Sequence, residues 1–161
     1  MRKDILSLLE RDGKRTPEEI AAYLDMPVQQ VREEIAQMER EQVICGYGAF
    51  VNWDRTDSDY LTALIEVRVT PSRGEGFNRV AERIARFDEV KAVYLMSGGY
   101  DLAVIILGKS LKDISFFVSD KLSPLESVLS TATHFVLKKY KDHGVLFEEK
   151  QDGDERMIVS P

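Results

Sequence analysis

Residues 16–44 constrain the fold most, because two short helical patterns follow each other across a tight break. Thr16 precedes Pro17 and lies three residues before Glu19, which is the spacing of a capping box that begins a helix. Residues 25–27, Asp-Met-Pro, form the break, and Pro27 is expected at the first position of the next helix. A β-prone stretch follows. The order predicts a winged helix-turn-helix.

The second helix of this pair is expected to be amphipathic and to run for about four turns. Its apolar stripe consists of Val28, Val31, Ile35 and Met38. The opposite face is polar and rich in glutamine, which is typical of a helix that reads the major groove. The candidates for base contact are Gln29, Gln30, Arg32, Glu33 and Gln37, and those for phosphate contact are Lys14, Arg15 and Arg40. A merely solvated helix face remains the alternative.

The remainder of the first half completes this domain. Residues 3–10 predict a helix with Gly13 as its C-cap, and residues 43–51 predict either the wing or a strand leading away. Cys45, in that apolar stretch, is expected to be a small buried residue. The polar, turn-rich residues that follow favour a linker at 54–60, so the winged helix-turn-helix domain is placed at 1–53.

The second half has a different periodicity. We expect strands at 61–69, 90–96, 102–107 and 128–140, with the middle two forming a hairpin. One helix pattern runs from Phe77 to Phe87, and a second is capped by Ser110 and continues to about residue 122. The order β-α-β-β-α-β predicts an α+β, ferredoxin-like domain at 61–141 with both helices on one sheet face. A second copy would cover the other face.

The charged tail, residues 142–161, is expected to add a short edge strand at 144–148. Residues 151–154 predict a turn and residues 157–159 a returning strand, with an unstructured tail as the alternative.

Composition limits the function classes. The net charge is −6, and residues 1–53 hold seven basic against ten acidic side chains. Since phosphate contacts supply most of the affinity for DNA, one such domain should bind DNA weakly, and a dimer or larger assembly should be needed.

The chain has one cysteine and two histidines, which favours neither a disulfide nor a metal site, and no cofactor is expected. The longest apolar runs are too short to cross a membrane. Acidic residues also occur too close to the N-terminus for a secretory signal peptide, so a cytoplasmic location is expected.

Residues 1–141 resemble the Lrp/AsnC family of feast/famine transcription regulators. The resemblance lies in DILSLLERDGKRTPEEIAAYLDMPVQQVREEI, VICGYGAFVN, VKAVYLMSGGYDLAVII and SVLSTATHFVL, in that order. It implies a DNA-binding regulator that is not an enzyme, a homodimer that often assembles further into octamers, and an amino acid or related metabolite as effector. The family often has Gly at positions 25 and 42, and Arg or Lys at positions 33 and 34, where this chain has Asp25, Gln42, Glu33 and Glu34.

The candidate effector site is the turn Ser97, Gly98, Gly99, Tyr100 and Asp101. Two glycines expose backbone N–H groups to a carboxylate, and Asp101 offers a partner for an ammonium group. The structural alternative is a hairpin turn alone. Thr131 and Thr133 align with threonines that line the effector pocket of the family, although threonine pairs are also common in ordinary strands.

Two other function classes stay open. A metabolite sensor or protein-interaction module without DNA binding is suggested by the acidic first domain. Siroheme decarboxylases also resemble Lrp/AsnC proteins and use His and Arg in the second domain. Here that domain has His134, and its arginines cluster on a loop and a helix.

Overall fold

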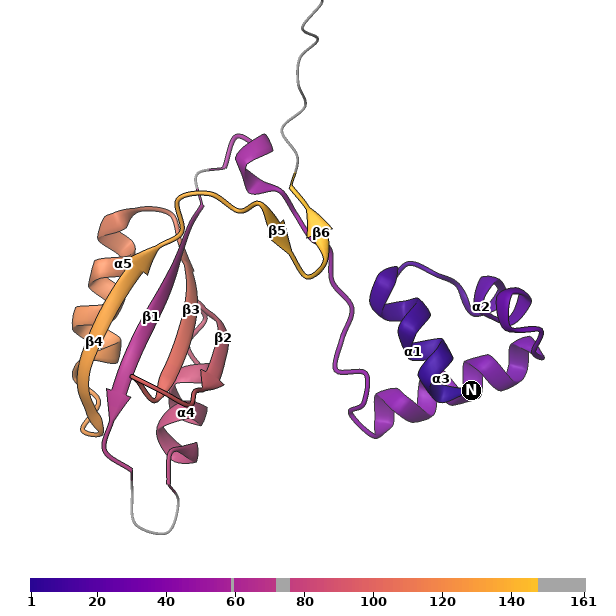
Figure 1. Ribbon diagram of the computed structural model, residues 1–161, viewed down its shortest axis with the longest axis horizontal. Coiled ribbons are helices and arrows are strands. Elements are labelled where there is room, and N and C mark those ends of the chain that lie inside the picture. Colours follow the sequence, from indigo (N-terminus) through magenta and orange to yellow (C-terminus); the bar gives the residue numbers. More distant parts are fainter. Residues whose placement is uncertain (59, 72–75, 148–161) are drawn as a thin grey trace, which may run out of the picture. The chain divides into compact units, whose positions relative to one another are not determined.

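The computed structural model describes residues 1–58, 60–71 and 76–147 and divides into two compact units, Met1–Phe50 and Val51–Pro161 (Figure 1). The turn expected at 151–154 and the strand expected at 157–159 lie outside the described residues.

The first unit contains three helices, α1 (Arg2–Arg11), α2 (Pro17–Leu24) and α3 (Val28–Arg40). The capping box is formed as predicted: the Glu19 amide donates to Thr16 Oγ1 at 3.2 Å, and the Thr16 amide donates to Glu19 Oε2 at 2.8 Å. The apolar stripes of the helices meet in one small core, which consists of Ile5, Leu8, Ile20, Ala21, Val31 and Met38. The sequence prediction of a helix-turn-helix is therefore confirmed.

Helix ends differ in detail from the prediction. The break between α2 and α3 turns on Asp25, which has φ 52° and ends α2, and Pro27 is the N-cap of α3 rather than its first residue. Gly13 is not the C-cap of α1, because Asp12 ends that helix in an extended conformation. Asp25 and Gln42, the latter at φ 57°, both adopt the left-handed conformation that glycine adopts most easily.

The strand expected at 43–51 is not formed, so the described chain carries no wing there. The amides of Val43 and Ile44 both bond back to the Met38 carbonyl oxygen and complete the end of α3. Residues 45–50 then form neither a helix nor a strand. The prediction for Cys45 was also wrong: its side chain is exposed, and its thiol donates to the Gln42 carbonyl oxygen at 3.2 Å.

The second unit has the predicted β-α-β-β-α-β order. It comprises β1 (Leu61–Val69), α4 (Asn78–Ala85), β2 (Val90–Leu95), β3 (Leu102–Gly108), α5 (Leu111–Phe117) and β4 (Val128–Phe135). The sheet is antiparallel with strand order β2-β3-β1-β4. Both helices cover one face (Figure 1), and the buried core lies between them and the sheet. Alternate β1 residues, Ala63, Ile65, Val67 and Val69, are buried there. The ferredoxin-like prediction is confirmed.

Smaller elements complete this unit. A 3-10 turn, Trp53–Arg55, precedes the sheet, and a π-helical turn, Val118–Leu122, continues α5 to the predicted end. β4 ends at Phe135, five residues earlier than predicted. The chain then forms a short hairpin from β5 (Lys141–Asp142) and β6 (Val145–Leu146), so the expected edge strand pairs with β5 and not with the main sheet.

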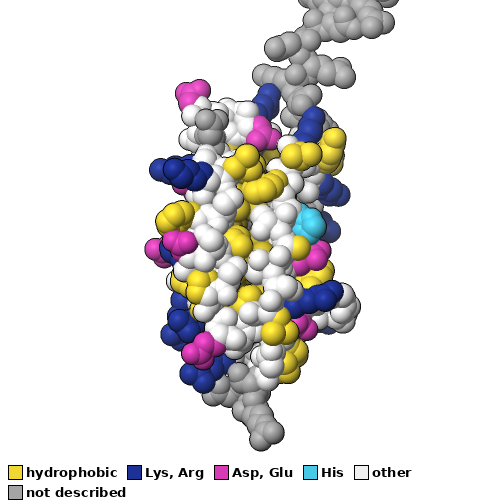
Figure 2. Space-filling model, turned by 90° about the vertical axis from the view of Figure 1, so that its left-hand side faces the viewer, with side chains coloured by type: hydrophobic (Ala, Val, Ile, Leu, Met, Phe, Trp, Pro, Cys, Tyr) yellow, Lys and Arg dark blue, Asp and Glu magenta, His cyan; other side chains and the backbone are white. Residues whose placement is uncertain are grey.

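The sheet face opposite the helices carries mixed side chains. His134 on β4 lies across from Leu64 of β1 and diagonal to Glu66, with His134 Nε2 3.3 Å from Glu66 Oε1. β4 has a sheet neighbour on one side only among the described residues. Figure 2, which looks onto the side where β4 and α5 lie, shows hydrophobic side chains gathered between charged ones.

Candidate functional site

The exposed face of α3 brings three of the five predicted base-contact residues together. Gln29, Arg32 and Glu33 are all exposed, and Gln29 Nε2 donates to Glu33 Oε1 at 2.9 Å. Arg32 forms an ion pair with Glu18 of α2. Because both partners are half exposed, this pair contributes little to stability, and Arg32 can leave it for another acceptor. These residues lie in the N-terminal half of α3, the part of a recognition helix that contacts bases.

The other two predicted base-contact residues have partners within the same unit, although Gln30 is exposed. Gln30 Nε2 lies 3.3 Å from Met1 Sδ, at the start of α1. Gln37 is half-buried: its amide donates to Glu41 Oε1 at 2.6 Å, and its oxygen accepts from Arg40 Nη2 at 2.6 Å. Arg40 is thereby held along the last turn of α3. Of these two residues only Gln37 is partly withdrawn from solvent, because Gln30 is exposed like Gln29, Arg32 and Glu33.

Arg2 neutralises part of the acidic charge of α3, a role that sequence reasoning missed. Its guanidinium donates to Glu34 Oε2 at 2.7 Å and to Glu41 Oε2 at 2.8 Å. The bond to Glu41, followed by that to Glu34, raises the pKa of Arg2, and bonds from Gln37 and then Arg2 lower the pKa of Glu41. Glu34 is therefore paired within the unit and is not presented as a free charge. The contact spans 32 residues, so no local pattern indicates it.

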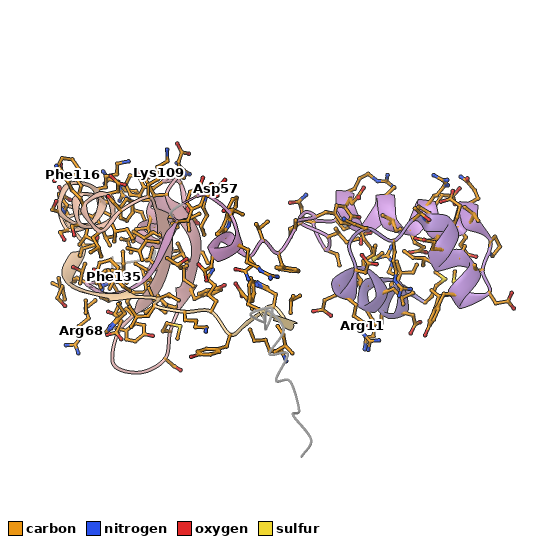
Figure 3. All side chains as sticks on the ribbon, turned by 90° about the horizontal axis from the view of Figure 1, so that it is seen from above. Arg11, Asp57, Arg68, Lys109, Phe116 and Phe135 are labelled. Atoms are coloured by element: carbon orange, nitrogen blue, oxygen red, sulfur yellow. The ribbon has the colours of Figure 1, made fainter. Side chains whose placement is uncertain are left out.

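The basic residues near the α1–α2 loop have different surroundings. Lys14 is exposed, whereas Arg15 is half-buried with its guanidinium 5.7 Å from the centre of the Tyr23 ring. Arg11 is a further exposed cation at the end of α1, and its side chain extends away from the helix (Figure 3). Sequence reasoning did not include Arg11 among the phosphate candidates, because it predicted that the helix ends at residue 10, whereas α1 continues to Arg11.

The turn at 97–101 is fastened to the end of β1. The Val69 amide donates to Asp101 Oδ2 at 2.9 Å, and the Asp101 amide donates to the Val67 carbonyl oxygen at 3.0 Å. Arg68 Nε donates to the Gly99 carbonyl oxygen at 3.0 Å. Within residues 97–101, all of which the structure describes, only Gly98 has a positive φ, at 137°. Asp101 therefore has a structural role in addition to any contact with a ligand.

Thr131 and Thr133 lie on the helix-covered face of β4, where they pair with Val67 and Ile65. Both are half-buried. Val67 of β1 thus pairs with Thr131 of β4 on one side and with Leu102 of β3 on the other. Leu102 directly follows Asp101, the last residue of the glycine turn. The structure places the glycine turn and Thr131 at the same end of the sheet, on either side of β1.

We expect Asp101→Ala to lower the free energy of unfolding of the second unit by about 1–3 kcal/mol, since it leaves the half-buried Val69 amide without its acceptor. Asp101→Asn keeps an acceptor oxygen and should restore most of that stability. Urea unfolding of both variants measures the difference. Equal stability of Asp101→Ala and the parent protein would contradict the structural role of this carboxylate.

Among the described residues, no group of three or more His, Cys, Asp or Glu side chains is placed to hold a metal ion. No helix within the same residues has both the length and the apolar character needed to span a bilayer.

Comparison with known proteins identifies both halves of this arrangement. Residues 62–146 match the Lrp/AsnC ligand binding domain. An HTH-type transcriptional regulator of Bacillus subtilis, YugG, is 51% identical over 98% of this chain and 95% of its own length. An HTH-type regulator of Pyrococcus furiosus is 32% identical over 81% of this chain and 86% of its own length.

Solved structures show the same fold at low sequence identity. E. coli AsnC is 17% identical, with a TM-score of 0.64 over 86% of this chain and 91% of its own. A transcriptional regulator of Neisseria meningitidis, solved with L-Met, is 21% identical, with a TM-score of 0.69 over 88% and 90%. Since the ligand-binding domain match covers more than half of the residues and YugG matches nearly all of them, this chain belongs to the Lrp/AsnC family of HTH-type transcriptional regulators.

Proposed function

We propose that this regulator binds a specific DNA sequence through the exposed face of α3. The observation that carries the proposal is the cluster of Gln29, Arg32 and Glu33 on the N-terminal half of a helix that a capped helix-turn-helix holds in place. Glutamine pairs with adenine, arginine with guanine, and glutamate accepts from cytosine, so this set can distinguish bases. Lys14 and Arg40 are proposed as phosphate contacts that fix the register.

The binding form is proposed to be a homodimer or a larger assembly such as an octamer. The first unit is acidic overall, so a single copy has few phosphate contacts from which to gain affinity. In a dimer or larger assembly, the helix-turn-helix units of two or more copies add their phosphate contacts on one DNA molecule. The open face of the sheet, with half-buried Leu64 and Ile105, offers an area that a second copy would cover.

The effector is proposed to be an amino acid or a related metabolite that binds at residues 97–101 and Thr131, with Thr133 nearby. The turn exposes backbone amides for a carboxylate. The effector changes DNA binding only if its affinity differs between two assemblies. The protein is proposed to act in the cytoplasm by binding and not by catalysis.

Fluorescence anisotropy on the DNA upstream of its own gene, with a scrambled duplex as control, tests this function. We expect tighter binding to the upstream duplex, with affinity for both duplexes falling as salt rises. L-methionine, which the Neisseria structure contains, and the other amino acids are then added in turn. A shift in affinity with one of them identifies the effector.

One observation favours a second candidate, a metabolite sensor that has lost DNA binding. Arg2 and Arg32, two of the seven basic residues of the first unit, are paired with acids inside it. This alternative predicts equal, weak binding to both duplexes even at low salt, together with retained amino-acid binding. If binding proves sequence-specific, the sensor interpretation is excluded.

A further inference from the structure

A pocket of about 680 Å³ opens in the second unit at the end of β3. Its walls come from the last residues of β3, one side of α5, Tyr60 before β1 and Glu89 before β2. A volume of this size is typical of small-molecule sites. β3 begins directly after the glycine turn and ends at the pocket, so the two sites lie at opposite ends of the sheet.

The apolar part of the pocket is formed by Leu107, Phe116, Phe117 and the ring of Tyr60. Phe117 is buried, whereas Phe116 is 62% exposed. Tyr60 also packs edge-on against Trp53, with ring centroids 4.7 Å apart. The pocket therefore presents aromatic surface to anything that enters it.

The wall between β3 and α5 is held by close packing. A Cβ on Gly108 would lie 2.8 Å from Cγ1 of the buried Ile114, so only glycine lets α5 approach β3 this closely. Fixed walls favour binding because the pocket requires little reorganisation when it is filled.

The charged part of the pocket is basic. Lys121 forms an ion pair with Glu89 on one wall, so that pair is neutral overall. Lys109 and Lys112 have no ion pair or side-chain hydrogen bond within the described part of the chain, and Asp113 is the remaining carboxylate of the lining. Two ammonium groups therefore face one carboxylate, in a protein of net charge −6. Figure 3 shows Lys109 and Phe116 projecting from the same side of this unit.

We propose that this pocket binds a small aromatic carboxylate. The carboxylate group contacts the ammonium groups of Lys109 and Lys112, and the ring packs against Phe116 and Tyr60. Ammonium–carboxylate hydrogen bonds are among the stronger polar contacts in proteins, and ring–ring packing adds to them beyond the area buried. Asp113 disfavours ligands with a second negative charge, so a monocarboxylate fits better than a dianion.

This site is distinct from the effector turn, and the proposal does not depend on DNA binding. Its ligand would contact Tyr60, which packs on Trp53 of the same unit.

The test is a titration of the full-length, 15N-labelled protein with phenylacetate, followed by NMR. We expect saturable shifts at the amides of Gly108, Lys112 and Phe116. Phenylacetamide has the same ring without the charge and should bind roughly tenfold more weakly. The double variant Lys109→Gln/Lys112→Gln should lose affinity for phenylacetate by about tenfold or more, while retaining the spectrum of a folded protein.

Lys91→Gln, on β2 and outside the pocket lining, is the matched control and should bind as the parent does. The absence of saturable shifts at millimolar phenylacetate would overturn the proposal, as would equal affinity for phenylacetate and phenylacetamide. Shifts confined to residues 97–101 would show that carboxylates bind only at the effector turn and would equally exclude this site.

Discussion

Replacing Ile20 with alanine is expected to unfold the helix-turn-helix unit and abolish DNA binding, while the second unit stays folded. Ile20 is fully buried at the centre of a core of six side chains. Removing a buried isoleucine side chain to alanine costs about 2–5 kcal/mol, from lost burial and the cavity left behind. A unit of this size has a stability of the same order, so most of that stability is lost.

Two-dimensional NMR of the full-length variant measures this result directly. The amide signals of residues 1–50 should collapse to the narrow range of an unfolded chain, while those of the sheet remain dispersed. Tyr23→Ala is the matched control, because Tyr23 lies on the same helix and is 70% exposed. It loses only a contact with Arg15 and should cost about 1 kcal/mol or less. A folded first unit in Ile20→Ala would contradict the assignment of this core.

The elements that were predicted well are those whose signals are local or strongly periodic. β1 was predicted at 61–69 and is observed at Leu61–Val69, because its alternating apolar residues all face one core. The start of α2 followed from the Thr16–Glu19 capping box, and the start of α5 from Ser110, whose hydroxyl accepts from the Asp113 amide at 3.1 Å. Each of these signals involves residues no more than four positions apart or a repeating face.

The features that were missed depend on contacts distant in sequence. The stretch 43–51 has β-prone residues, but a strand needs a partner, and none of the described residues supplies one. Arg2 is separated from its partners Glu34 and Glu41 by more than thirty residues of sequence. The partial burial of Gln37 likewise reflects contacts with Arg40 and Glu41, which helical periodicity alone does not reveal.

The double variant Gln29→Ala/Arg32→Ala is expected to lose specific DNA binding by roughly 100-fold or more. Both side chains are exposed on the N-terminal half of α3. One good bidentate contact to a base is worth about 1–3 kcal/mol of discrimination, so two lost contacts amount to about 2–6 kcal/mol. The loss should appear on the cognate duplex and be small on a scrambled one, because phosphate contacts are largely retained.

The matched comparison is Lys14→Ala, which removes an exposed cation outside α3. A phosphate contact has no base preference, so this variant should weaken binding to cognate and scrambled DNA alike and reduce the salt dependence by about one contact. All three variant positions are exposed, so thermal unfolding should change little and any loss of binding can be assigned to the DNA contact itself. If Gln29→Ala/Arg32→Ala binds the cognate duplex as tightly as the parent protein, the exposed face of α3 is not the base-reading surface. The specificity must then lie in DNA shape, or in Gln30 and Gln37 after they leave their present partners.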